Sequence, residues 1–430
     1  MKNRLLAAAV LAGCALLMTG CREKGKNHLE IFSTKMENQA ILQSFIDDYT
    51  QEHPEVTIEF NSPPDASTVL RTKLTKNRVP DIIFMGGDMT FRDMSEAEIL
   101  MDLSDMEEAG RIKEAYKEQV YNLNPDQEEK LFGLPYATNA EGIIYNVDIF
   151  NEQGLEIPKT WDELYDTAKA LTKDGVYGLS FPCGTNDFQA TFFLDFYVRS
   201  GGGSLLTDDL KANLTSDLAI DGINYWLKVY NDCSPKDSIN FDVLDQATLY
   251  YQGKTAFDFN SGFQISGVAA NSPDLLQYVD CYPVPKVHAD DGTEGIMTTN
   301  TPMVVWKASK HPEICKAFMK TLYEEDTYVE FLHATPVGML PAIKGIADTD
   351  AYKDDETIKQ FAHAEEVLTA AADIGTAFGY EHGPNVQAGI MQNNHVIEEM
   401  FQDIITNGTD VRTAAKAAED KLNALFETAE

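Results

Sequence analysis

Basic residues are scarce in this sequence. Its 430 residues include 34 lysines and arginines against 69 aspartates and glutamates, so the formal net charge is −35. A surplus of negative charge on this scale repels a phosphate backbone, which argues against a nucleic-acid partner. The same surplus excludes neither a neutral nor a cationic small molecule.

The common nucleotide and catalytic motifs are missing. There is no Gly-x-x-x-x-Gly-Lys-Ser/Thr loop, no Gly-x-Gly-x-x-Gly and no His-Glu-x-x-His, and the eight histidines are scattered. The nearest approach to a Gly-x-Ser-x-Gly elbow, Asn260-Ser261-Gly262, lacks the first glycine. We therefore expect no cofactor, no metal and no enzymatic activity, although a pair of hydrolytic carboxylates could exist among so many acidic residues.

Cysteine is also sparse, with six in the whole chain. Two of them, Cys14 and Cys21, lie near the N-terminus. The other four are far apart in sequence and have no zinc-ligand spacing: Cys183, Cys233, Cys281 and Cys315. An exported protein can form disulfides, whereas a large core favours buried thiols, and the sequence leaves both possibilities open.

The one long apolar run lies at the N-terminus. Residues 1–4 are short and basic, residues 5–20 are apolar or small, and Cys21 follows. The run has about 16 residues, fewer than the ~20 that span a bilayer, and its layout is that of a secretory signal peptide.

The end of this run, Thr19-Gly20-Cys21, resembles a bacterial lipobox. The resemblance implies a signal peptide over residues 1–21, an acylated Cys21, a polar tether over residues 22–27 and a location on the extracellular face of the cell membrane. Residues 11–14 match the usual lipobox better, but cleavage at Cys14 would leave a very short apolar core. Acylation of Cys14 and an uncleaved anchor helix remain alternatives.

The remaining chain is long enough for two domains. Its first part alternates predicted strands with predicted helices, which indicates an α/β domain with a largely parallel sheet. The expected strands cover residues 28–32, 56–60 and 81–85, and the expected helices cover residues 38–49 and 67–77.

A second α/β region begins near residue 143. Thr160 and Glu163 have the spacing of a capping box at the start of a helix, and residues 178–181 read as a strand. Further helices are expected over residues 218–230, 312–322, 357–372, 386–405 and 411–426.

Several segments, in their order and spacing, resemble family 1 of the extracellular solute-binding proteins of ABC importers, which includes maltose-binding protein. They are residues 80–84, 133–146, 158–164, 251–257, 260–263, 282–285, 309–318, 336–341 and 407–411. The chain departs from the family pattern at Phe257, where methionine is usual, and at Phe263, where tryptophan is frequent.

The resemblance implies a type II periplasmic-binding-protein-like α/β fold, with two lobes joined by crossover hinge segments. The expected N-terminal lobe comprises residues 28–140 plus 296–337, and the expected C-terminal lobe comprises residues 141–295 plus 338–430. Such a protein captures a small solute, here a sugar or oligosaccharide, in the cleft between the lobes. It then delivers the solute, as a monomer, to ABC permease subunits whose ATPase is a separate chain.

By family position, four loops and a later segment should contact the ligand. Sugars present hydroxyl groups and apolar C–H faces, so aromatic rings and polar side chains suit them. The expected ligand-binding residues are Lys35, Glu37, Asn38, Gly87, Asp88, Tyr136, Asn139, Glu141, Asn260, Phe263, Met339 and Glu381. Phe263 is the expected stacking ring, Asn38 and Asp88 fit helix capping equally well, and Trp161 and Trp226 are expected in the core.

Other solutes and functions remain open. A polyamine or another non-sugar solute could use Asp88, Glu141 and Glu381 as a ring of carboxylates. A secreted glycoside hydrolase would need two carboxylates about 5–10 Å apart across the cleft. A surface adhesin would show no lobe closure on binding a ligand.

Overall fold

The computed structural model describes residues 27–35, 38–64, 66–86, 91, 94, 98–113, 130–288, 296–383 and 385–429. The predicted signal peptide, the lipidation site Cys21 and most of the tether lie outside these residues, as do Glu37, Gly87 and Asp88. Within the described part, no helix combines the length and the apolarity that crossing a bilayer requires.

The first part of the chain forms the predicted strands and helices within a few residues. The elements are β1 (His28–Ser33), α2 (Gln39–Glu52), β2 (Thr57–Asn61), α3 (Ala66–Thr75) and β3 (Ile82–Phe84). Strand β1 lies between β2 and β3 and runs parallel to both, as the alternation of strands and helices predicts. Helix α2 forms here because Leu42, Phe45, Ile46 and Tyr49 recur at helical spacing and are all buried.

The sheet continues through antiparallel strands. These are β4 (Leu134–Asn146), β5 (Phe257–Ser261), β6 (Val279–Tyr282) and β7 (Thr298–Val305). The strand order is β2-β1-β3-β7-β4-β5, with β6 also paired to β4.

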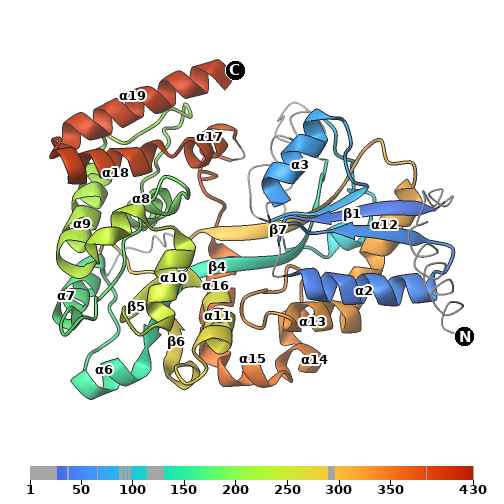
Figure 1. Cartoon of the computed structure of the whole chain (residues 1–430), viewed down its shortest axis with the longest axis horizontal. Helices are drawn as coiled ribbons and strands as arrows, with labels where there is room; N and C mark the ends of the chain where they lie inside the picture. The colour runs from blue at the N-terminus through green and yellow to red at the C-terminus, as the bar shows by residue number, and fades with distance from the viewer. Residues whose placement is uncertain are drawn as a thin grey trace, which may run out of the picture.

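Strand β4 serves both halves of the molecule. Its first half pairs with β7, from Leu134 opposite Met303 to Ala140 opposite Thr298. Its second half, from Glu141 onward, pairs with β5 and β6. We call the part built on β1, β2, β3 and β7 the first lobe, and the part built on β5, β6 and the end of β4 the second lobe; β4 and β7 run between them (Figure 1).

Helices cover both lobes. In the second lobe, α7, α8, α9, α18 and α19 gather on the side far from β1 (Figure 1). The remaining bounds are α6 (Val147–Gln153), α7 (Trp161–Leu171), α8 (Gln189–Ser200), α9 (Asp217–Cys233), α10 (Val243–Tyr251), α11 (Phe263–Asn271), α12 (Pro312–Leu322), α13 (Glu325–His333), α14 (Asp350–Lys353), α15 (Glu356–Gln360), α16 (Ala362–Ile374), α17 (Gln387–Asn394), α18 (Val396–Asn407) and α19 (Val411–Ala429).

The buried apolar side chains form two clusters. The first runs from Leu29 to Ala372 and includes the buried residues between 339 and 372. The second runs from Ile143 to Phe426. The first cluster also contains Val279 and Cys281 of β6, and α16 packs against β4 and β6. The clusters therefore do not separate the two lobes, and the lobe boundaries stay a prediction.

Trp161 and Trp226 lie in the second cluster, as predicted. Trp161 is 2% exposed and its Nε1 donates to Ser200 Oγ at 2.6 Å, while Trp226 stacks on Phe181 with ring centroids 5.2 Å apart. Both rings hold helices of the second lobe together.

Three local predictions can be compared directly. The capping box of Thr160 and Glu163 is confirmed at the start of α7. The predicted strand over residues 178–181 is wrong, because this buried segment is irregular and Ser234 bonds its backbone at Leu179 and Phe181. The predicted helix over residues 386–405 divides into α17 and α18 at His395, which has a left-handed φ of 51°.

The predicted helix over residues 357–372 also divides, into α15 and α16 at Phe361. Phe361 has a φ of −108° and is buried in the first cluster. Tertiary packing of this ring thus interrupts a segment whose local pattern is continuous.

Candidate functional site

The loops that follow β1 and β3 meet at one edge of the sheet. Thr34 N donates to Phe84 O at 3.0 Å, and Gly86 N donates to Thr34 Oγ1 at 2.7 Å. Parallel strands bring their carboxyl ends to the same edge, which is where ligands of open α/β sheets bind.

Tyr136 connects these loops to β4. Its side chain is fully buried, its hydroxyl donates to Met85 O at 3.0 Å, and it accepts from Asn38 Nδ2 at 3.4 Å. Asn38 stands at the N-cap position of α2, yet its side chain makes no capping hydrogen bond to the described residues of that helix. Of the two expectations for Asn38, the structure thus contradicts helix capping.

Six of the predicted ligand-binding residues line one small pocket. They are Lys35, Asn38, Tyr136, Asn139, Phe263 and Met339, and the pocket between them is too narrow for a water-sized sphere. The elements that supply these residues are far apart in sequence. The fold thus brings together side chains for which the family resemblance implies a common binding site.

Four further residues line this pocket that were not predicted: Ala137, Thr138, Thr301 and Gly338. Thr301 lies on β7, and its Oγ1 donates to Ala137 O at 2.8 Å across the strand pair. The first two adjoin predicted positions on β4 and could have been inferred from them. Nothing in the local sequence distinguishes Thr301 from any other strand threonine.

Two amide oxygens in the pocket have no hydrogen-bond donor in the described part of the chain. Asn38 Oδ1 and Asn139 Oδ1 are buried, and neither accepts a hydrogen bond from the described part of the chain. A buried acceptor without a donor costs about 1–3 kcal/mol. Both oxygens therefore suit a ligand that donates hydrogen bonds.

Tight backbone packing positions Phe263 at this pocket. A Cβ atom on Gly262 would lie 2.1 Å from Val337 O, so the chain turns into α11 directly against the segment 337–338. Val337 itself has a left-handed φ of 67°. Because only glycine fits at position 262, Phe263 begins α11 at a fixed place beside the pocket.

Two carboxyl groups, one half-buried and one buried, lie beside this site. Glu141 on β4 is opposite Ser261 on β5. Burial raises the pKa of Glu141 to about 7; the negative charge of Asp258 adds to this rise, and Lys35 opposes it. Burial also raises the pKa of Asp258 to about 6.

Asp258 was not predicted as part of the site. It accepts from Gln246 Nε2 at 2.6 Å and from Asn260 Nδ2 at 3.1 Å. Asn260 was predicted to bind ligand, and here its Nδ2 is bonded to Asp258. The sequence does carry a signal for Asp258, because residues 258 and 260 of one strand point to the same side of the sheet.

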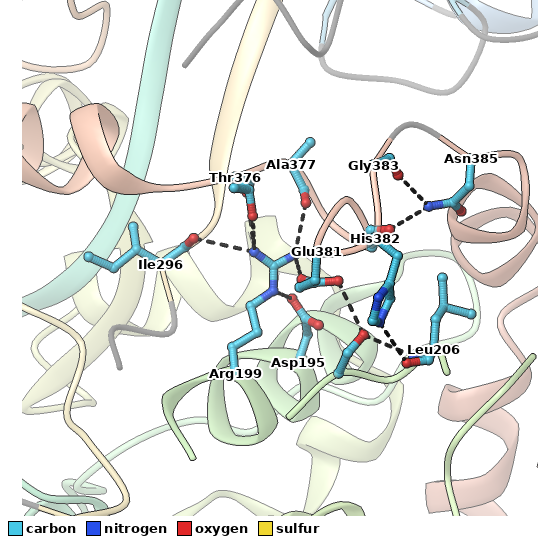
Figure 2. A network of polar contacts seen from close by, with 12 residues as sticks. Asp195, Arg199, Leu206, Ile296, Thr376, Ala377, Glu381, His382, Gly383 and Asn385 are labelled. Atoms are coloured by element: carbon cyan, nitrogen blue, oxygen red, sulfur yellow. Dashed lines mark hydrogen bonds and ion pairs between the residues drawn. The ribbon is translucent and has the colours of Figure 1, made fainter. Parts of the chain in front are cut away.

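Glu381 lies in a different cluster, shown in Figure 2. It pairs with Arg199 and accepts from Ser204 Oγ at 3.2 Å. Arg199 also pairs with Asp195, with Nε and Oδ2 2.7 Å apart. Glu381 is therefore bound into a nearly buried ionic network of the second lobe and is not brought to the pocket of Phe263.

The same guanidinium holds two chain segments. Arg199 Nη1 donates to Thr376 Oγ1 at 2.9 Å and to Ile296 O at 3.4 Å, and Nη2 donates to Ala377 O at 2.8 Å (Figure 2). Residue 296 precedes β7, and residues 376–377 follow α16. The network thus ties α8 to two segments that adjoin the junction between the lobes.

The four cysteines of the body are free and buried: Cys183, Cys233, Cys281 and Cys315. The structure therefore selects buried thiols over disulfides. Among the described residues, no group of three or more His, Cys, Asp or Glu side chains is arranged to hold a metal ion.

Residues 33–328 match the family model of the bacterial extracellular solute-binding proteins. This chain belongs to that family. The resemblance noted from the sequence motifs is confirmed, and the protein is a solute-binding protein of the ABC-transporter type rather than an enzyme.

Individual relatives agree with this assignment. The multiple sugar-binding protein of Streptococcus mutans is 32% identical over 249 residues, which are 53% of this chain and 58% of that protein. The melibiose/raffinose/stachyose-binding protein MelE of Bacillus subtilis is 21% identical over 370 residues, covering 82% and 84% of the two chains.

The fold also matches solved structures. An ABC transporter solute-binding protein of Thermotoga lettingae, bound with α-D-tagatose, superposes with a TM-score of 0.77. The two share 19% sequence identity, and the match covers 93% of this chain and 99% of that one. The predicted type II, two-lobed α/β fold is confirmed by this likeness.

Proposed function

We propose that this protein captures a sugar or oligosaccharide in the pocket of Phe263 and delivers it to the permease of an ABC transporter. Lipid on Cys21 would hold the monomeric receptor at the extracellular face of the membrane, and the ATPase would be a separate chain. The observation that carries the proposal is the composition of the pocket: the ring of Phe263 beside two buried amide oxygens without donors among the described residues.

This composition suits a polyol. A sugar ring places its C–H face on an aromatic ring, and its hydroxyl groups donate to amide oxygens. Asn38 Oδ1 and Asn139 Oδ1 would both be satisfied in this way. An anion without hydroxyl or amine groups fits poorly, because it brings no donors for these two oxygens. The names of the relatives in Streptococcus mutans and Bacillus subtilis, which are sugar-binding proteins, support the same ligand class.

Thermal unfolding of the body from residue 22 onward, measured against a panel of sugars, tests the ligand class. A ligand that binds only the folded state stabilises it by RT ln(1 + [L]/Kd), about 2.7 kcal/mol at a concentration one hundred times Kd. We expect a neutral sugar or oligosaccharide to raise the melting temperature. If no sugar raises it, the proposed ligand class is wrong.

Two variants identify the binding site. Phe263→Ala should abolish the sugar-induced shift and leave the unliganded protein folded. Tyr278→Ala is the matched control, because Tyr278 is an aromatic residue that is 36% exposed and lies outside the pocket. A sugar shift that survives Phe263→Ala would place the ligand elsewhere.

A cationic solute is the second candidate. Asp258 is buried and Glu141 is half-buried, and a polyamine could neutralise both carboxyl groups while its ammonium groups donate hydrogen bonds. Spermidine therefore belongs in the same panel. A shift with spermidine and none with sugars would favour this candidate over the first.

The anchor is tested separately from the ligand. Mass spectrometry of the mature N-terminus in a bacterial host should find a diacylglyceryl-modified Cys21. A modified Cys14 would move the cleavage site, and an unmodified N-terminus would remove the lipid anchor from the proposal.

A further inference from the structure

The side chain of Lys35 lies over the ring of Phe263. Its Nζ is 4.5 Å from the ring centroid. Lys35 belongs to the loop that follows β1 in the first lobe, whereas Phe263 begins α11, directly after β5 of the second lobe. An ammonium group at this distance is attracted by the negative face of the ring.

Two neighbours hold Lys35 in this position. Its aliphatic part runs along the backbone of Gly86, since a Cβ atom added there would be 3.4 Å from Lys35 Cε and 3.5 Å from Cγ. The positive charge of Lys35 also acts on Glu141. The contact of the aliphatic part with Gly86 and the electrostatic attraction of the ammonium group thus both favour the observed position of the side chain.

The remaining pocket is small for a ligand. It leaves no room for even a water-sized sphere, whereas sites for small molecules commonly enclose about 300–1,000 Å³. A sugar ring cannot lie on the face of Phe263 that the ammonium group covers. The pocket therefore has to change before it can hold a disaccharide.

We propose that Lys35 is an internal occupant of the site: in the unliganded protein it covers the face of Phe263, and a ligand has to displace it. The displacement by a ligand rests on the proposed function. The contact between Lys35 and Phe263 in the unliganded protein does not depend on it. The exchange links recognition of the ligand to a movement of the Lys35 side chain. Lys35 is thus a specificity-determining residue, because a solute that cannot cover the ring cannot replace it.

Nuclear magnetic resonance of the protein with ¹³C-dimethylated lysines tests the occupied state. Dimethylation preserves the positive charge of the amine. The Lys35 resonance is identified by its loss in Lys35→Arg. We expect it upfield in the unliganded protein, because the group lies over an aromatic ring, and we expect Phe263→Leu to move it to the position of exposed lysines.

Lys228 provides an internal control. Its Nζ lies 3.5 Å from the centroid of Tyr165, so its resonance should also be shifted upfield. Phe263→Leu should leave the Lys228 resonance in place. If the Lys35 resonance lies with those of exposed lysines and does not respond to Phe263→Leu, the inference is overturned, whatever the protein binds.

Titration with maltose and with raffinose then tests displacement. A sugar that raises the melting temperature should move the Lys35 resonance to the exposed position and leave that of Lys228 unchanged. A sugar that binds without moving Lys35 would overturn displacement and leave the proposed function intact. If neither these sugars nor others bind, the proposed function fails, while the comparison with Phe263→Leu still decides whether Lys35 covers the ring.

Discussion

Arg199 and Asp195 lie one turn apart on α8 and form an ion pair, with Nε and Oδ2 2.7 Å apart. Their side chains are only 5% and 2% exposed. A buried pair of this kind is destabilised strongly when one partner is removed, because the other charge is left without compensation.

We therefore expect Arg199→Met to reduce the free energy of unfolding by about 3–5 kcal/mol. It would also release Ile296 and Thr376 from α8. Urea denaturation monitored by circular dichroism measures the change. The matched control is Lys416→Met, which breaks the exposed pair with Asp420 and should leave stability almost unchanged. Equal effects of the two variants would contradict a stabilising role for the buried network.

Glu398 should make stability depend on pH. It is fully buried, and its Oε1 accepts from Thr191 N and Oγ1, both at 2.8 Å. Burial raises the pKa of its carboxyl group to about 7 from an ordinary value of 4.5. The folded state thus holds this proton more tightly than the unfolded state does, and the resulting stabilisation is lost as pH rises from about 4.5 through about 7.

Glu398→Gln removes this titration. The free energy of unfolding of the wild type, relative to the variant, should decline over that pH range and become constant above it. Urea denaturation at a series of pH values gives both curves. Curves that stay parallel from pH 4 to pH 8 would mean that Glu398 does not titrate with a raised pKa.

Gly262 should tolerate no side chain. Because a Cβ atom would meet Val337 O at 2.1 Å, Gly262→Ala has to displace α11 or the segment 337–338. We expect a loss of about 1–3 kcal/mol in the free energy of unfolding, as for other overpacked sites. Gly110→Ala is the control, since a Cβ atom added there would meet no atom of the described residues within 4 Å; a loss of similar size there would refute the packing argument.

The four thiols of the body should be unreactive in the native state. Each is buried, and burial raises the pKa of Cys183, Cys233, Cys281 and Cys315, which lowers the fraction of reactive thiolate. Ellman's reagent should titrate four thiols in the unfolded body and almost none in the folded body. Fewer than four thiols after unfolding without reductant would indicate a disulfide.

Periodicity predicted the first lobe well, because each strand and helix there has its own apolar pattern and its own ending. The strand at residues 28–32 and the helix at residues 312–322 illustrate this. The failures arose where distant residues decide the backbone. Only Gly178 of residues 178–181 bonds to strand β5, while Leu179 and Phe181 bond to Ser234. His395 adopts a left-handed conformation within a continuous helical pattern.

The site was partly predictable for the same reason. Lys35, Tyr136 and Phe263 follow strands or crossovers whose order matches the family, and they line one pocket. Glu381 matched only a position late in the chain, and its pairing with Arg199 depends on a residue 182 positions away by sequence number (381 − 199). Ion pairs between such distant residues leave no periodic or local signal.

Strand β4 has a consequence for dividing the protein. Since residues 134–140 complete the sheet of the first lobe and residues 141–146 complete that of the second, neither lobe is a separable module. A fragment that ends at residue 140, or one that begins at residue 141, would expose unpaired strand edges, which promote aggregation. Split reporters and domain exchanges based on this scaffold should therefore keep β4 whole and place their junctions in surface loops.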